Sequence, residues 1–126
     1  MKELSNPIKF FVKGLPPSPN KIGRSHWAVQ AKNKREWQEK VLWLVKSKKP
    51  SERLKRAHIA FIICTGDKRR HDPDNLNWAV TKPTLDALKE IILVDDSIDN
   101  IVLEYSYTRE GERGFTVKIT ALDTIP

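Results

Sequence analysis

The chain has 126 residues, of which 39% are hydrophobic, a length that suits one compact domain over residues 1–126. No apolar run approaches the roughly 20 residues of a membrane span, and residues 1–9 lack the apolar centre of a signal peptide. The single Cys64 excludes an internal disulfide. We therefore expect a cytoplasmic protein with no membrane partner. Residues 1–56 hold 15 Lys and Arg against 4 Asp and Glu, and residues 57–126 hold 8 against 12, so the net charge of +7 divides into +11 and −4; such a basic excess suits a polyanionic partner such as nucleic acid.

Three elements are predicted in the first half of the chain. Apolar and polar residues alternate over Ile8–Lys13, which predicts a strand, and the prolines of residues 14–20 then predict a rigid, extended loop. From about residue 25 to residue 48 apolar residues recur at helical spacing with lysines and arginines between them, which predicts a long amphipathic helix with a basic outer face. Ala57–Cys64 is β-branched and nearly all apolar, so we expect a central strand covered on both faces.

A second helix is predicted from near Asp72 or Asp74 to about Ile92. Pro83 falls inside it, and a proline in a helix removes one backbone hydrogen bond and clashes with the previous turn. Two alternatives follow from this. Either the helix kinks at Pro83, or Pro83 is the first residue of a fresh helix.

The last third of the chain predicts two strands. Apolar and polar residues alternate over residues 101–107 and again over residues 115–121, and residues 109–114 between them predict a hairpin. The order is therefore β-α-β-α-β-β. It predicts an α/β fold of the α+β type, in which a mixed sheet carries both helices on one face.

The segment with the clearest chemical content is residues 67–76, in which two carboxylates follow a basic triplet. In an extended backbone Asp72 and Asp74 point to the same side. Two carboxylates so close repel each other, and the repulsion is relieved by a raised pKa on one of them or by a bound cation. Oxygen ligands of this kind suit Mg²⁺ or Mn²⁺ rather than Zn²⁺. The alternative is that both aspartates only cap a helix, whose dipole favours negative charge at its start.

A third carboxylate is available downstream at Asp95 or Asp96, at the far end of the second helix or on the turn that leaves it. A sheet that brings both helix ends together would place it beside the first two. The triplet Lys68, Arg69 and Arg70 would bind phosphate next to the metal. Phosphodiester hydrolysis needs this combination, because a metal activates water and steadies the leaving oxygen while cations hold the substrate.

Taken together, these elements resemble the RusA-type Holliday-junction resolvases, a family common in phages and prophages. The shared elements are a Pro-Pro-Ser-x-Asn sequence at residues 16–20, a basic run followed by Asp-x-Asp-Asn-Leu at residues 69–76, then Lys82, an Asp-Ala-Leu at residues 86–88 and an Asp-Asp pair at residues 95–96. The resemblance covers most of the chain, and the order, the spacing and the total length agree.

The resemblance implies a Mg²⁺-dependent endodeoxyribonuclease of DNA recombination and repair, in which a homodimer binds four-way DNA junctions and makes paired nicks near the crossover. Carried over residue by residue, it makes Asp72, Asp74 and Asp96 metal ligands and Lys82 an active-site lysine. The sequence departs from the best-known form of the family at this lysine, which there follows the Asn by about one helical turn, nearer Trp78.

We expect DNA contacts from seven polar and basic residues: Asn20, Lys21, Arg24, Lys68, Arg69, Arg70 and Asn75. Asn75 has two other roles open to it, orienting a metal ligand or capping the helix. Asp86 is expected to pair with Lys82 four residues earlier, which leaves it out of the metal site. Among the tryptophans, Trp37 is expected in the core, and Trp27 is the expected stacking contact with unpaired bases.

Two other functions stay open on the sequence. One is a non-catalytic module that binds branched DNA and whose aspartates merely cap helices. It would bind junctions equally with and without Mg²⁺ and would never nick them. The other is a metal-dependent phosphoesterase that acts on RNA or small substrates. An experiment in which junction, duplex and RNA compete for the protein would distinguish it.

Overall fold

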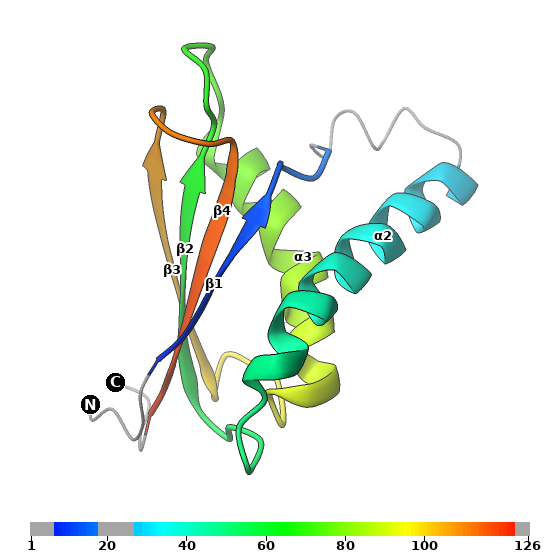
Figure 1. Ribbon diagram of the computed structural model, residues 1–126, viewed down its shortest axis with the longest axis vertical. Coiled ribbons are helices and arrows are strands. Elements are labelled where there is room, and N and C mark those ends of the chain that lie inside the picture. The colour runs from blue at the N-terminus through cyan, green and yellow to red at the C-terminus, as the bar shows by residue number, and fades with distance from the viewer. Residues whose placement is uncertain (1–6, 18–26, 123–126) are drawn as a thin grey trace.

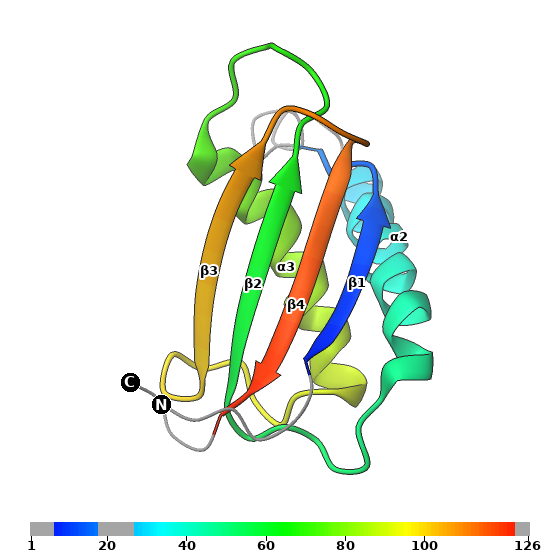
Figure 2. The same ribbon diagram turned by 60° about the vertical axis from the view of Figure 1, so that its left-hand side comes forward.

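The computed structural model describes residues 7–17 and 27–122, with the side chains of Trp27 and Gln30 excepted. In chain order the elements are β1 (Ile8–Lys13), α2 (Trp27–Val45), the short 3₁₀ helix η1 (Lys46–Lys48), β2 (Ala57–Cys64), α3 (Pro73–Ile91), β3 (Ile101–Thr108) and β4 (Gly114–Ala121). The strands form one sheet in the order β1-β4-β2-β3, and both helices lie on one face of it (Figure 1, Figure 2). The predicted fold class, an α+β domain with a mixed sheet and two helices on one face, is confirmed.

The connection between β3 and β4 is not the predicted hairpin. Within the described strands β3 pairs with β2 in parallel, and β4 pairs antiparallel with the other side of β2 and with β1. In Figure 2, β2 therefore lies between β3 and β4. The prediction was wrong because alternation and turn residues indicate two strands and a reversal, whereas the partner of each strand depends on the whole sheet. Here the long crossover through α3 places β3 parallel to β2 on one side, which leaves the other side of β2 for β4.

The helices cover one face of the sheet and leave the other only partly buried, which corrects the expectation that β2 is covered on both faces. On the covered face Ile59, Phe61 and Ile63 have no exposed surface, whereas Ile62 on the opposite face is 41% exposed. The apolar run of β2 suggested two covering layers, but both helices pack on the same side. No further element among the described residues covers the other face.

The core lies between the sheet and the two helices. Val41 of α2 and Val80 and Leu88 of α3 contribute fully buried side chains to it. α3 is one continuous helix that contains Pro83, so the alternative of a fresh helix at this proline is wrong. The hydroxyl of the buried Thr84 donates a hydrogen bond to the carbonyl of Val80 at 2.6 Å. Neither of the described long helices has the length and apolar character needed to cross a membrane.

The strand directions bring three connections to one end of the sheet. β1, β2 and β3 run in the same direction, because β1 and β2 are both antiparallel to β4 and β3 is parallel to β2. Their carboxyl ends lie at the end of the molecule where α3 begins, at the top of Figure 1. Residues 14–17, the β2–α3 loop and the β3–β4 connection therefore lie at the edge where open α/β sheets usually bind ligands.

Candidate functional site

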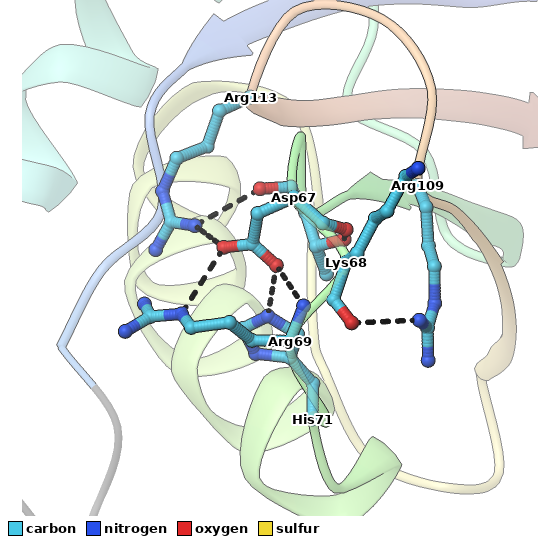
Figure 3. Close-up of polar contacts among 7 residues, drawn as sticks. Asp67, Lys68, Arg69, His71, Arg109 and Arg113 are labelled. Atoms are coloured by element: carbon cyan, nitrogen blue, oxygen red, sulfur yellow. Dashed lines mark hydrogen bonds and ion pairs between the residues drawn. The ribbon is translucent and has the colours of Figure 1, made fainter.

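Asp67 organises the loop between β2 and α3. Its Oδ1 accepts a hydrogen bond from the backbone N–H of Arg69 at 3.1 Å and lies 2.8 Å from Nε2 of His71. Its Oδ2 lies 3.5 Å from Nε of Arg69 and 3.5 Å from Nη1 of Arg113 (Figure 3). The hydrogen bond with His71 is the main cause that lowers the pKa of Asp67, and it outweighs the opposing effect of burial. An ionised carboxylate therefore holds the loop in shape.

The β3–β4 connection braces this loop from the other side. Nη1 of Arg109 donates a hydrogen bond to the carbonyl of Lys68 at 3.0 Å, and Nη1 of Arg113 donates one to the carbonyl of Thr65 at 3.0 Å. Gly66 has a φ of +69°, and a Cβ at this position would lie 3.1 Å from the Cβ of Arg113. A glycine is therefore needed where the two segments approach each other. The two arginines add positive charge to this end of the molecule.

The two candidate metal ligands lie where the loop becomes α3. Asp72 is the N-cap residue, with an extended φ of −89° and ψ of 125°, and Asp74 lies in the first turn after Pro73. The expectation of an extended backbone through both aspartates is wrong, because Pro73 already begins the helix. Their Cα atoms are still no more than about 7.6 Å apart, since two residues span two Cα–Cα distances of about 3.8 Å.

Both carboxylates are available for an external ligand. Asp72 and Asp74 are exposed, Asp72 makes no capping hydrogen bond with its side chain, and among the described residues neither side chain has a hydrogen bond or ion pair. Mg²⁺ usually keeps several waters and takes only one or two protein carboxylates together with substrate phosphate oxygens. Either exposed carboxylate therefore has the chemistry to take a Mg²⁺ ion together with water and substrate oxygens, and the capping alternative explains the position of Asp72 without explaining its free side chain.

The third predicted ligand, Asp96, does not join this pair within one chain. Its Oδ2 lies 3.4 Å from Nζ of Lys89, near the end of α3. Lys89 follows Asp74 by fifteen residues on the same helix, which corresponds to about 22 Å at 1.5 Å per residue. Accordingly, the described ranges contain no group of three or more His, Cys, Asp or Glu side chains placed to hold a metal. The expectation that both ends of the second helix come together is wrong for a single chain, because α3 itself separates them.

The adjacent Asp95 and Asp96 differ in their contacts. Oδ1 of Asp95 accepts a hydrogen bond from the backbone N–H of Asp96 at 2.9 Å, and Oδ2 accepts one from Nδ2 of Asn100 at 3.1 Å. Hydrogen bonds from Ser97 and then Asn100 are the main causes that lower the pKa of Asp95. Asp95 therefore holds its own loop in shape, whereas the side chain of Asp96 reaches out of the loop to Lys89.

Lys82 lies two helical turns beyond Asp74 on α3. Its Nζ is 3.2 Å from Oδ1 of Asp86, which confirms the predicted pair, and Nζ of Lys34 on α2 reaches Oδ2 of the same carboxylate at 3.6 Å. The eight residues from Asp74 to Lys82 correspond to about 12 Å along the helix. Trp78 occupies the position one turn after Asp74. Within one chain Lys82 is therefore not beside the two aspartates.

Basic side chains border the carboxylate pair. Lys68 and Arg70 are exposed and have no charged partner within the described ranges, whereas Arg69 is paired with Asp67. Asn75 is half-buried in the first turn of α3. Three predicted DNA contacts, Asn20, Lys21 and Arg24, and the side chain of Trp27 lie outside the described residues.

Sequence reasoning missed the contributions of Asp67, Arg109 and Arg113. For Asp67 a local signal was present, because an aspartate side chain readily bonds the backbone N–H two residues later. The arginines gave no such signal. They reach the loop from 41 and 48 residues away, and only the strand order brings them to it.

Comparisons with known proteins add no assignment. No protein-family model and no curated protein matches the chain. The likeness to RusA-type resolvases therefore rests on the sequence motifs, and the site supports the function as a proposal.

Proposed function

We propose that this protein is a Mg²⁺-dependent endodeoxyribonuclease of the RusA type that resolves four-way DNA junctions by paired nicks, with Mn²⁺ as a substitute ion. The observation that carries the proposal is the pair of exposed carboxylates, Asp72 and Asp74, which have no partner in the described part of the chain and follow a basic loop. A hard cation needs such oxygens, and a polyanionic substrate needs the cations beside them.

Each part of the site has a separate role in this reaction. A divalent cation held by Asp72 and Asp74 would polarise the scissile phosphate and lower the pKa of the attacking water. Lys68 and Arg70 would bind the phosphates around the scissile bond, because their side chains are exposed and unpaired within the described residues. Asp67 would act through position alone, since an ordered loop keeps these cations at a constant distance from the carboxylates.

The proposal includes a homodimer, because paired nicks in a four-way junction require two active sites related by a two-fold axis. Such a dimer also offers a place for Asp96. In it, Asp96 of a second copy would join Asp72 and Asp74 of the first. The charges suit this pairing, since the basic residues 68–70 would face the acidic segment that holds Asp95, Asp96 and Asp99.

The test is the nicking of a synthetic four-way junction and a matched duplex at low salt, with and without Mg²⁺. We expect paired, Mg²⁺-dependent nicks in the junction. Asp72→Asn should lower turnover on the order of 100-fold, or about 3 kcal/mol, and should keep or tighten DNA binding because a negative charge is removed. Glu39→Gln is the matched control, since it removes an exposed negative charge from α2, away from the site.

Two outcomes would contradict the proposal. Tight junction binding without cleavage in either Mg²⁺ or Mn²⁺ would favour the non-catalytic DNA-binding module, in which Asp72 serves only at the start of the helix. Cleavage that RNA or a small phosphodiester suppresses better than a junction does would favour a phosphoesterase of those substrates.

A further inference from the structure

A cavity of about 420 Å³ lies between α2, α3 and the prolines that follow β1. Its apolar wall includes Pro16, Pro17, Trp37, Trp78, Ala79 and Pro83. The cavity lies beside the proposed metal site, because Trp78 follows Asp74 by one helical turn and so neighbours it on the surface of α3. Cavities of several hundred Å³ with aromatic walls and few polar groups are typical of small-ligand sites.

The two tryptophans form different kinds of wall. Trp37 is half-buried and held in place, since it packs against the core and Nζ of Lys40 lies 4.4 Å from its ring centroid. Trp78 leaves 48% of its surface exposed. A fixed ring and an open ring therefore face the same cavity, and a planar ligand can stack on the open one.

Two lysines that line the cavity and the carboxylate that they share together carry one net positive charge. Lys34 and Lys82, whose side chains are 53% and 54% exposed, share the carboxylate of Asp86, whose side chain is only 14% exposed. Each ammonium group has three N–H donors, so both keep donors for an anion. Asn33 also lines the cavity and adds an amide that can donate and accept.

We propose that this cavity binds one unstacked nucleobase of the branched DNA, with the phosphate of that nucleotide on Lys34 and Lys82; this inference rests on the proposed function. Every base has a flat face that stacks on tryptophan, Asn33 can bond its edge, and the single net charge matches one phosphodiester. A nucleotide at a branch point has already lost part of its stacking, so turning it out costs less than in a duplex. The bound base would fix the distance from the crossover to the phosphate at Asp72 and so select where the nick falls.

The proposal is tested with junctions that carry a single abasic nucleotide, moved in turn through each position near the crossover. Binding is measured with the Asp72→Asn protein without divalent metal, so that no cleavage interferes. We expect one position at which loss of the base weakens binding about tenfold. Trp78→Ala in the same protein should bind intact and abasic junctions equally. Trp43→Ala should keep the tenfold difference, because Trp43 is 75% exposed on α2 and does not line the cavity.

Trp78→Leu controls for lost packing, since it keeps apolar volume without the aromatic ring and should behave like Trp78→Ala. A protein that binds junctions but has no abasic-sensitive position would overturn this inference and leave the proposed function standing. If both Trp78 variants were as sensitive to the abasic nucleotide as the protein with Trp78 intact, this inference would likewise be overturned and the proposed function would stand. A protein that binds no junction at all would overturn both.

Discussion

Replacing Asp72 by alanine should change the thermal stability of the metal-free protein only slightly. A capping aspartate contributes about 1 kcal/mol through its hydrogen bond, and attraction to the helix dipole adds about 0.3–1 kcal/mol. Asp72 makes no such hydrogen bond, so only the dipole contribution is lost. For 126 residues, an unfolding entropy of about 2.1 cal/mol/K per residue converts 1 kcal/mol into about 4 °C. We therefore expect Tm to fall by about 1–4 °C. Replacing an aspartate that also made the capping hydrogen bond would lower Tm by about 5–8 °C.

Added Mg²⁺ should separate the variants further. An ion that binds only the folded chain stabilises it by RT ln(1 + [L]/Kd), which at ten times Kd is about 1.4 kcal/mol, or about 5 °C for this length. The unmodified protein should show this increase, and Asp72→Ala should not. Val80→Ala is the matched control, because it truncates a fully buried side chain of α3. It should lose about 2 kcal/mol of stability and keep the full increase with Mg²⁺.

The assay is a set of thermal melts followed by circular dichroism, over a series of Mg²⁺ concentrations. A fall in Tm beyond 5 °C without metal would show that Asp72 caps the helix despite the missing hydrogen bond. An increase with Mg²⁺ that is the same in Asp72→Ala as in the unmodified protein would refute the metal-binding role.

Three further predictions concern the dimer, the loop and DNA binding. If a second copy supplies Asp96, mixing inactive Asp72→Asn and Asp96→Asn proteins should restore nicking, because a mixed dimer has one intact site; continued inactivity in mixed dimers would contradict a shared site. Because the pKa of Asp67 is lowered from its ordinary value of 3.8, its contacts stabilise the fold fully at pH values above 3.8. This stabilisation is lost as the pH falls through the lowered pKa of Asp67. Its carboxyl carbon should therefore titrate below pH 3.8 by NMR, and a midpoint at or above 3.8 would contradict this. Arg70→Ala should reduce the slope of log binding against log salt by about one without changing Tm. Lys118→Ala, on the opposite face of the sheet, should leave that slope unchanged.

Local patterns were sufficient for the elements and for near neighbours along the chain. The alternation over Ile8–Lys13 identified β1 with its observed bounds, and the helix expected from Asp72 or Asp74 to Ile92 is α3, Pro73–Ile91. The pair of Lys82 and Asp86 was predictable because residues four apart on a helix are always neighbours. These features depend on the spacing of apolar and charged residues within one helix or strand, which can be read directly from the sequence.

The tertiary structure alone decided how the elements and the carboxylates are combined. The alternation of apolar and polar residues does not indicate which strand pairs with which. The placement of β4 against β2 rather than β3 followed only from the crossover through α3. The same helix separates Asp74 in its first turn from Lys89, the ion-pair partner of Asp96, by fifteen residues or about 22 Å. The support of the loop by Arg109 and Arg113 likewise depends on contacts across more than 40 residues. Such contacts arise from the packing of the whole sheet, and no short stretch of sequence contains them.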